Sequence, residues 1–520
     1  MHRGLQILEI VELICSNVVQ ISPTSPRRTA RTLAALARTC TIFSGPALDA
    51  LWRKQTSLAP FLKLMPEDLF EPSDRPGGLH NRQWRLSRPI VATDWSRATT
   101  YAFRVRELFL SHFGFERTSD VLQAFILCCP SGFLFPRLRI LTYPLSHPTP
   151  IRIFLPSTLE QISVTGEASH TSLSLLSALA NSCPRLKSVA VSLSPESGHV
   201  NHNTCLLVAA LHSLVSLTMD TPTLAGISHL GQLSTLTTLR LGSLPSTLVS
   251  LSSGSPPMFP RLRLLQVASA PIGPATALIR RCSNTPLVYL NLNFQTCPTI
   301  VEMEAFYKAL RAVCVHASLE SITLGALKPV SPAARRDDYA ITGRSLDILT
   351  CFTKLGALFL TAPGGFDLDD PSIARLAAAW PNLKNLWLAT VPSDVEPRLT
   401  LQSLRSLAEH CPNLRLLHIN VDARSIPPTG PTRVVHYCLT SINVASSPIS
   451  GAPPVARYIS GLFPNVSEIT TAREDEDNDD AEEIIQNVKA IQYHNLWKEV
   501  ETQVPEFVAT RAEEQAWGPI

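Results

Sequence analysis

The 520-residue sequence lacks the features that mark several classes of protein. Its formal net charge is only +3, so we expect neither nucleic acid nor a membrane surface as its main partner. No segment offers the roughly 18 consecutive apolar residues that a membrane span needs. The N-terminal stretch carries Glu9 and Glu12 inside its apolar run and lacks a small-residue cleavage site, which argues against a signal peptide.

Short catalytic and cofactor motifs are missing as well. The sequence contains no GxGxxG, GxxxxGK[ST], HExxH or GxSxG. His199, His202 and Cys205 form the best metal-like cluster, but no fourth ligand lies nearby in the sequence. The carboxylates of 367–370 are expected to belong to a loop and a helix cap. We therefore expect no metal, no cofactor and no catalysis by the chain itself.

Cysteine and proline usage narrows the class further. Twelve cysteines in a chain of this length are not a disulfide framework, and four directly precede proline, as small buried residues in a reducing compartment would. The chain has 42 prolines, but 45% of its residues are hydrophobic, which is too apolar for a disordered polypeptide. We expect a folded cytoplasmic or nuclear protein, in which the sequon at Asn465 has no meaning.

One short phrase returns along the chain. It reads "CPNLRLLHI" from Cys411, "CPRLKSVAV" from Cys183, "FPRLRLLQV" from Phe259 and "WPNLKNLWL" from Trp380. The shared pattern is Leu-x-x-Leu-x-Leu, with Ile, Val or Met allowed, and its spacing averages about 28 residues, inside the range of roughly 20 to 29 for leucine-rich repeats. Full matches begin at Val105, Leu159, Leu186, Leu214, Leu236, Leu262, Leu287, Leu319, Leu355, Leu383, Leu414 and Leu439, and weaker ones at Leu138 and Val466.

The positions of each phrase predict its local structure. The fourth and sixth positions are two residues apart, so in a strand both point to one side, and we expect that side to face the core. Amphipathic stretches precede the phrases, and a proline two residues before the first anchor ends the helix. Such prolines stand at Pro136, Pro184, Pro260, Pro381, Pro412 and Pro464. Units of helix, turn and strand cannot bury their apolar edges alone and must stack.

The pattern thus predicts an α/β leucine-rich-repeat solenoid, a horseshoe with parallel strands on the concave face and helices outside. The alternative is that these are Leu-rich core strands of an ordinary α/β domain. The phrases depart from the usual repeat in one respect, because the Asn or Cys expected three residues after the last Leu is absent. That position holds Ser194, Pro222, Ala270, Val391 and Asp422 instead.

The first fifty residues have a different, helical pattern. "ILEIVELICSNV" has apolar residues at helical spacing, and "SPTSPRR" interrupts it with turn residues. "RTLAALARTCTIFSGPALDALWR", from Arg31 to Arg53, predicts a second helix and then a third that restarts after Gly45-Pro46. "LAALARTC" with "PALDALW" resembles the F-box proteins of mushroom-forming (basidiomycete-type) fungi, and the resemblance covers residues 5–53.

This resemblance implies a function. In that family the F-box docks on the Skp-type adaptor of a cullin-RING ubiquitin ligase, and the C-terminal repeats hold a substrate. The family opens with Leu-Pro, whereas here Leu8 stands where the proline belongs. A helical cap that shields the first repeat is the alternative. Carried over by position, the adaptor-binding residues would be Ile7, Leu8, Ile10, Val11, Ile14, Leu33, Cys40, Leu48 and Trp52.

The remaining segments complete a four-part organisation. The parts are the F-box (1–56), a linker or N-terminal cap (57–104), the repeats (105–472) and an acidic loop with a C-terminal capping helix (473–520). The linker is expected to be partly ordered and to pack Trp84 and Trp95 on the array. The capping helix is expected over 484–503, packed through Ile484, Val488, Ile491 and Leu496.

Residues between the inward positions should line the concave face. That column reads Ala190, Thr218, Arg240, Gln266, Asn291, Thr323, Phe359, Trp387, His418 and Asn443. Exposed aromatic side chains with polar neighbours on a rigid sheet are typical of binding hot spots. The alternative is that a loop such as that within 328–343, or the C-terminal segment, covers the patch. The predicted substrate-binding residues are Tyr289, Phe359, Asn385, Trp387, His418 and Asn420.

Together these observations predict a substrate receptor that brings an unknown target protein to a Skp/cullin-RING ligase without contributing chemistry. A repeat scaffold that binds a protein partner without ligase coupling is the first alternative. An enzyme whose catalytic groups meet only in the fold is the second.

Overall fold

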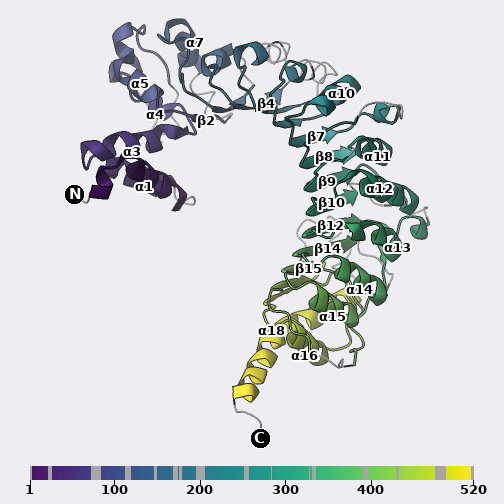
Figure 1. The fold of residues 1–520 in the computed structure, drawn as a ribbon. Helices are drawn as coiled ribbons and strands as arrows, with labels where there is room; N and C mark the ends of the chain where they lie inside the picture. The colour runs from purple at the N-terminus through teal and green to yellow at the C-terminus, as the bar shows by residue number, and fades with distance from the viewer. Residues whose placement is uncertain are drawn as a thin grey trace. The chain divides into compact units, whose positions relative to one another are not determined.

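The computed structural model describes residues 3–21, 26–71, 84–111, 119–145, 149–167, 174, 179–194, 205, 207–250, 257–282, 284–326, 328, 330, 335–390, 396–428, 433–474 and 488–516. They belong to two compact units, Met1–Gly226 and Ile227–Ile520. Parallel strands alternate with helices in both units, so the fold is the α/β leucine-rich-repeat solenoid that the sequence predicts (Figure 1).

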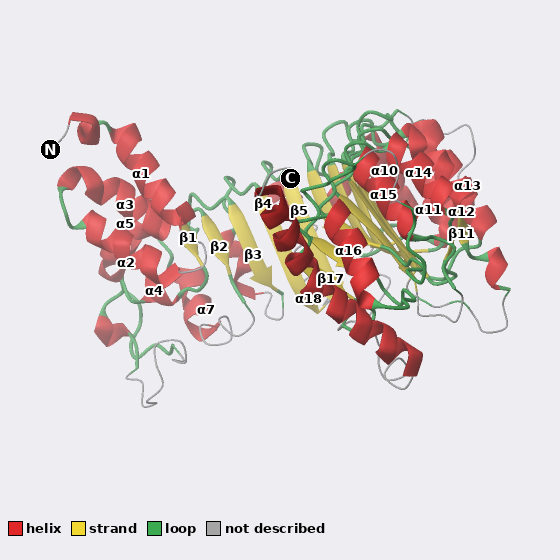
Figure 2. Cartoon of the chain, turned by 90° about the horizontal axis from the view of Figure 1, so that it is seen from below, coloured by secondary structure: helices red, strands yellow, loops and turns green. Residues whose placement is uncertain are grey.

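The first unit begins with helices and continues with parallel strands. Its helices and 3-10 helices are η1 (Arg3–Gln6), α1 (Leu8–Ile21), α2 (Pro26–Ala37), α3 (Thr41–Arg53), α4 (Ala59–Leu62), η2 (Glu67–Leu69), η3 (Ala92–Asp94), α5 (Trp95–Ala102), α7 (Ser119–Cys128) and η4 (Thr149–Phe154). Its strands are β1 (Lys54–Gln55), β2 (Glu107–Phe109), β3 (Ile140–Pro144), β4 (Gln161–Glu167), β5 (Ser188–Ser194) and β6 (Ser216–Met219). Each strand pairs in parallel with the next, and Figure 2 shows β1 to β5 in this order.

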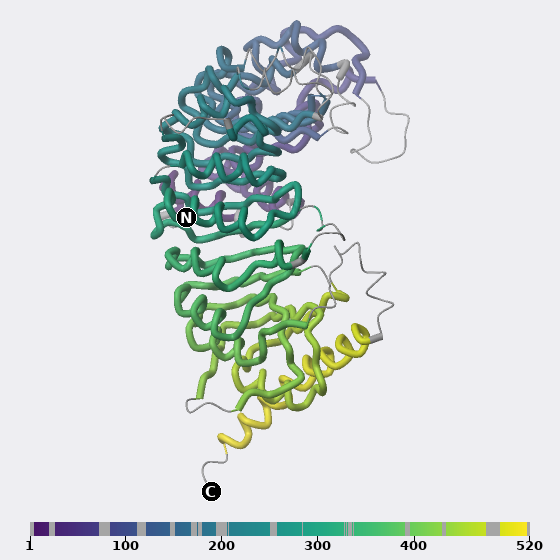
Figure 3. The backbone as a smooth tube through the Cα atoms, turned by 90° about the vertical axis from the view of Figure 1, so that its right-hand side faces the viewer, coloured from purple at the N-terminus to yellow at the C-terminus, as the bar shows by residue number. Residues whose placement is uncertain are grey.

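The second unit begins within α10 and repeats the same plan. Its helices are α10 (Leu224–Gln232), η5 (Ser246–Ser250), α11 (Ile272–Arg281), α12 (Ile300–Val313), η6 (Arg336–Asp338), α13 (Gly343–Leu346), η7 (Asp347–Cys351), α14 (Asp370–Ala379), α15 (Leu401–His410), α16 (Ala452–Leu462) and α18 (Val488–Ala516). Its strands are β7 (Thr238–Ser243), β8 (Leu264–Ala270), β9 (Tyr289–Phe294), β10 (Ser321–Ala326), β11 (Ile341–Thr342), β12 (Ala357–Ala362), β13 (Phe366–Asp367), β14 (Asn385–Thr390), β15 (Leu416–His418), β16 (Ser441–Asn443) and β17 (Glu468–Thr470). Figure 3 shows its successive coils stacked from teal to yellow.

Parallel pairing in the second unit follows the chain. It runs from β7 through β8, β9, β10, β12, β14, β15 and β16 to β17, while β11 pairs only with β13. Helices α11, α12, α14 and α15 cover one face of these strands (Figure 1). We call the other face of the second unit, lined by the column Arg240, Gln266, Asn291, Thr323, Phe359, Trp387, His418 and Asn443, the open face.

The repeated phrase occupies the interior, as its pattern predicts. Every anchor residue of the phrase, including the weaker copies at Leu138 and Val466, is at most 4% exposed. The fourth and sixth positions are equally buried, for example Leu417 and Ile419. Burial of an aliphatic side chain contributes roughly 1.5 to 3 kcal/mol. The core therefore lies between the sheet and its helices and extends from one repeat to the next.

Prolines end the helices where the sequence places them. Helices α14, α15 and α16 each stop two residues before Pro381, Pro412 and Pro464. The residue between helix and proline leaves the helical conformation in each case, as at Cys411 with φ −116° and ψ 71°. A residue before proline avoids the helical region because of the proline ring. The same turn thus recurs in these repeats.

Ser and Thr side chains form a hydrogen-bond ladder at the start of the strands, at a position other than that of the usual asparagine. The residue immediately before an anchor donates its side chain to the preceding repeat. Ser318 Oγ lies 2.8 Å from Leu287 O, and Ser213 Oγ lies 3.3 Å from Leu186 O. Thr158 occupies the equivalent place in an earlier repeat. These bonds satisfy backbone carbonyls at the junctions between repeats. They come from the residue before each anchor, whereas the missing asparagine would stand three residues after the last Leu.

The sequence predicts that the third helix restarts after Gly45-Pro46, and this prediction is wrong. Helix α3 begins at Thr41 and runs through both residues to Arg53. Ser44 N already donates to Cys40 O at 3.1 Å, so the first turn forms before the proline. Pro46 removes one later hydrogen bond, but the helix continues through it and its ring is buried.

The segment after the N-terminal helices is folded where the structure describes it. Trp95 packs on Phe125 of α7 with ring centroids 4.9 Å apart, so this tryptophan reaches the array as expected. Trp84 instead packs on Phe70 of its own segment, also at 4.9 Å. Both indoles are buried.

The C-terminal helix differs from the expected 484–503 in extent and packing. Helix α18 ends at Ala516, while 484–487 lies outside the described residues. Ile491 and Leu496 are only half-buried. The fully buried side chains are Trp497, Val500 and Val504.

Helix α18 also occupies the free edge of the last strand. Glu501 Oε1 accepts from Ile469 N at 2.9 Å, and Lys498 Nζ donates to Ile469 O at 3.0 Å. Trp497 Nε1 donates to Ser447 O at 2.9 Å. An unpaired strand edge invites association, and these contacts cover the edge of β17.

Candidate protein-binding surfaces

The N-terminal helices enclose a small core of their own. Val11 and Cys15 from α1, Leu33 from α2, and Phe43 and Ala47 from α3 are buried together. Two of the nine predicted adaptor-binding residues, Val11 and Leu33, therefore face inward and are 0% and 2% exposed. Such side chains support the helices rather than present a surface.

The other predicted adaptor residues lie nearer to solvent. Ile7, Leu8 and Ile10 are 48%, 53% and 39% exposed. Leu13, which the sequence reasoning missed, is 60% exposed and continues the i, i+3 series begun by Ile7 and Ile10. That spacing was the signal that could have found it. The half-buried members are Ile14, Cys40, Leu48 and Trp52.

Trp52 has a place in the repeat array. Lys54 pairs in register with Glu107, two residues after the anchor Val105, so Trp52 stands in the anchor position of an additional repeat whose strand is β1. Its ring lies 4.9 Å from that of Tyr101 on α5. The Leu-x-x-Leu-x-Leu pattern does not reveal this repeat, because polar residues fill its fourth and sixth positions.

An arginine joins the N-terminal helices to the first repeats. Arg104 Nη1 contacts the Asp49 carboxylate and donates to Gly45 O at 3.2 Å, both on α3. The helical region is thus continuous with the strands that follow it.

The open face brings the predicted substrate-binding aromatics into register. Phe359 pairs with Trp387, and Trp387 pairs with His418, on strands β12, β14 and β15. Ring centroids are 6.5 Å apart for the first pair and 4.2 Å for the second. Three rings on adjacent strands form one row, as the column read from the sequence implies.

Exposure differs along this row. Phe359 and Trp387 are half-buried, while His418 is only 3% exposed, so the expectation of an exposed His418 is wrong. Strands β15 and β16 are short, and a hydrogen bond from Val421 N to Ser447 Oγ at 2.8 Å joins the segments that follow them.

Burial changes the acid–base behaviour of His418. It lowers the pKa of the imidazole from 6.5 to about 4, because a cation is disfavoured away from water. Nδ1 is buried and has no hydrogen-bond partner among the described residues. His418 is therefore neutral at neutral pH and acts as a packing surface for Trp387.

The other predicted substrate-binding residues flank the row. Tyr289 is 50% exposed at the start of β9, and Asn385 lies at the start of β14, half-buried. Asn420 Oδ1 accepts a hydrogen bond from Ser447 Oγ at 3.1 Å, within the bend after β15. Tyr289 and Asn385 thus lie on the same side as Phe359 and Trp387, whereas Asn420 is engaged internally.

The acidic stretch before α14 has the capping role that the sequence predicts. Asp369 Oδ1 accepts from Ser372 N at 3.0 Å at the start of the helix, and the hydrogen bonds with Ser372 lower the pKa of Asp369. Asp367 pairs with Arg398 at 2.8 Å. These carboxylates are engaged in the fold.

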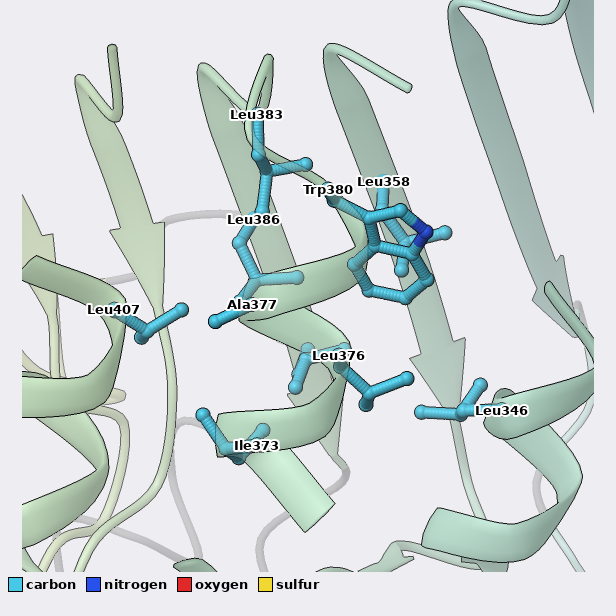
Figure 4. Close-up of a pocket in the computed structure, with 10 residues that line it drawn as sticks. Leu346, Leu358, Ile373, Leu376, Ala377, Trp380, Leu383, Leu386 and Leu407 are labelled. Carbon is cyan, nitrogen blue, oxygen red and sulfur yellow. The ribbon is translucent and has the colours of Figure 1, made fainter. Parts of the chain in front are cut away.

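One internal void of the second unit is small and apolar. A void of about 10 Å³ lies between α14 and the sheet, with the Trp380 ring and leucines such as Leu358 and Leu386 around it (Figure 4). This volume is at the limit for one water molecule. Trp380 Nε1 donates to Leu349 O at 3.4 Å. The void is a packing feature of the core and gives no sign of a ligand site.

The metal-like cluster cannot be assembled from the described residues. His199 and His202 lie outside them, and the Cys205 thiol accepts from Thr223 N at 3.4 Å. Within the part of the chain that the structure describes, no group of His, Cys, Asp or Glu could hold a metal ion. Among the same residues, no helix is long and apolar enough to cross a membrane.

Comparisons with known proteins give structural neighbours only. No family model and no curated protein sequence matches the chain. A crystal structure of the Rad7 and Elc1 complex in yeast is similar over 67% of this chain and 81% of that one, with 13% identity and a TM-score of 0.33. The leucine-rich repeat-containing protein LegL7 from Legionella pneumophila is similar over 70% of this chain and 98% of its own, with 13% identity and a TM-score of 0.31.

Proposed function

We propose that the chain is the substrate-recognition subunit, or F-box receptor, of a Skp/cullin-RING ubiquitin ligase. Helices α1 to α3 dock on the Skp-type adaptor, and the open face of the second unit holds a target protein. The chain contributes proximity, because a bound target has a high effective concentration near the ligase.

The observation that carries the proposal is the apolar stripe of α1, defined as Ile10 and Leu13 of the helix together with Ile7, the residue directly before it. These side chains are exposed although the helix has a complete core on its other side. Apolar side chains at i, i+3 spacing on one helix face suit docking into a partner groove. The resemblance of residues 5–53 to the F-box supports the adaptor as that partner.

The target surface is proposed at Tyr289, Phe359 and Trp387. Half-exposed aromatic side chains on a rigid sheet lose little conformational entropy on binding, and residues of this type dominate the energetics of protein interfaces. His418, on the adjacent strand, packs against Trp387 with 4.2 Å between ring centroids.

A scaffold without ligase coupling is the second candidate. Its support is that Val11 and Leu33 face inward and that Trp52 packs on Tyr101. Three of the residues that the resemblance assigns to the adaptor therefore have structural roles as well. In this alternative the N-terminal helices only cap the first repeats.

Binding of the full-length chain to a purified Skp-type adaptor, measured by calorimetry, tests the proposal. The double variant Ile10→Asp, Leu13→Asp changes only exposed positions, and we expect it to weaken binding at least about tenfold. Val91→Asp is the matched control, because Val91 is also apolar and 50% exposed. Trp52→Ala is less informative, since it also removes the contact with Tyr101.

Two results would contradict the docking role. If the wild-type chain does not bind the adaptor, the scaffold becomes the better description. If the double variant binds as well as wild type, docking does not use α1.

A further inference from the structure

A column of arginines runs along the start of the first strands. Arg106 N donates to Arg53 O at 2.9 Å, and Arg139 N donates to Arg106 O at 2.8 Å. The three residues therefore stand directly beside one another at β1, β2 and β3. Neighbouring strands are about 4.8 Å apart, so three guanidinium groups start from a row roughly 10 Å long. We call Arg53, Arg106 and Arg139 the arginine row.

Carboxylates balance this row only in part. Arg53 Nε lies 3.1 Å from Glu107 Oε1, and Arg139 Nε lies 3.9 Å from Glu160 Oε1. Arg106 forms no ion pair among the described residues, but its Nη1 donates to Phe103 O at 3.1 Å and to Arg137 O at 3.4 Å. Glu160 is the next residue in the same column and is shared with Lys187 at 4.0 Å.

A fourth arginine strengthens the positive field at Arg106. Desolvation by burial lowers the pKa of Arg106, and repulsion from Arg137, Arg139 and Arg53 lowers it further. The Arg137 guanidinium stands 5.7 Å from the centre of the Phe103 ring, which is 45% exposed. Like charges directly opposite one another on neighbouring strands destabilise a sheet.

We propose that the arginine row is a docking site for an acidic peptide segment of another protein, one rich in Asp or Glu. Carboxylates would form charge-assisted hydrogen bonds with the guanidinium groups, which bind such groups bidentately. The occupant follows from charge complementarity at exposed side chains: Arg53 and Arg139 are 67% and 63% exposed.

Nucleic acid fits this site less well. A row of roughly 10 Å faces only a few phosphates, whereas binding to nucleic acid needs a longer basic track. Glu160, directly before β4, follows Arg139 in the column and ends the row with a negative charge. The site uses none of the α1 or open-face residues, so the inference does not depend on the proposed function.

Fluorescence anisotropy of a labelled deca-glutamate peptide with the full-length chain tests the site. At about 0.1 M salt we expect saturable binding that weakens as salt is raised. The variant Arg53→Glu, Arg139→Glu should weaken it about tenfold or more. Lys384→Glu, Arg415→Glu is the matched control, because these exposed residues occupy the same column in the second unit. Its affinity should stay close to that of wild type.

Three outcomes would overturn the inference. They are no binding of deca-glutamate by the wild-type chain, equal loss in both double variants, and tighter binding of a labelled deca-thymidylate than of deca-glutamate. The single variant Arg137→Gln provides an independent check if the charge reversal disturbs folding, which circular dichroism would report. It should weaken peptide binding measurably, since Arg137 adds to the field at Arg106, and unchanged affinity in this variant would also count against the site.

Discussion

The column at the start of the strands differs between the two units. In the first unit it carries Arg53 and Arg106 beside Arg139, whereas in the second unit the corresponding stretch holds Gly356 before Lys384 and Arg415. The first unit thus has three adjacent arginines in this column. The compared stretch of the second unit has two adjacent cations next to a glycine, which has no side chain. The backbone ladder is the same in both cases, so it does not dictate the charge that a strand start carries.

The columns that point away from the core differ as well. In the first unit Phe109, Thr142, Ser163 and Ala190 stand side by side on β2, β3, β4 and β5. In the second unit the corresponding column holds Phe359 and Trp387. The first unit thus carries a single ring in this column and a row of arginines at its strand starts, while the second unit has two rings on adjacent strands.

The inward positions show no such divergence. Leu141 in the first unit and Leu386 in the second are both almost fully buried. A stacked array requires apolar residues at these positions, because each repeat buries its neighbour's edge. Outward positions are free of that requirement, so a repeat protein can vary its surface chemistry along one scaffold.

Equivalent core substitutions provide the strongest test of this comparison. Leu141→Ala and Leu386→Ala should each lower the free energy of unfolding by about 2 to 5 kcal/mol, since each leaves a cavity. Urea unfolding followed by circular dichroism measures the loss. Leu127→Ala is the control, because Leu127 is 89% exposed on α7 and should change little. If the core variant of either unit kept the wild-type free energy of unfolding, the two interiors would not be equivalent.

Acid should affect the second unit through His418, which has no titratable counterpart among Thr142, Ser163 and Ala190. The folded-state pKa of about 4 lies below the unfolded value of 6.5, so the unfolded chain takes up the proton first as pH falls. The contribution of neutral His418 to the free energy of unfolding is fully present above about pH 6.5. It declines toward pH 4, by about 3 kcal/mol in total.

Urea unfolding of wild type and His418→Gln across this pH range measures the effect. The variant should lose the part of the pH dependence that is due to His418. Equal slopes for the two proteins between pH 6.5 and 4 would contradict the buried, neutral imidazole.

The side-chain ladder at the repeat junctions should matter in both units, to a smaller degree. Ser318→Ala removes the bond to Leu287 O and should cost about 1 kcal/mol. Ser213→Ala should cost less, because its bond to Leu186 O is longer, 3.3 Å against 2.8 Å. Thermal unfolding of the two variants ranks them, and a larger loss for Ser213→Ala would contradict the ladder geometry.

An outward substitution should have the smallest effect. Thr142→Phe places an aromatic ring in the first unit at the column where the second unit has Phe359. We expect a change within about 0.5 kcal/mol, as for surface positions in general. The melting temperature measures it, and a large loss would show that outward positions of the first unit are not free to vary.

Much of the fold could be predicted because its signals are local. The positions two apart in each phrase fixed which residues face inward, and the register of Phe359 with Trp387 followed from the same count. Prolines marked the ends of helices α14 to α16. The exposed stripe of α1 was found in part, since Ile7 and Ile10 were named and Leu13 was not.

What the sequence determined by itself is the repeat, its inward face and the order of its columns, because strand alternation and the apolar period act over a few residues. Only the tertiary structure decided that Trp52 begins an extra repeat, that His418 is covered and that Arg53, Arg106 and Arg139 form one row. Those facts depend on hydrogen-bond register between segments separated by unequal lengths of chain. No local pattern encodes that alignment, and the packing of the whole array selects it.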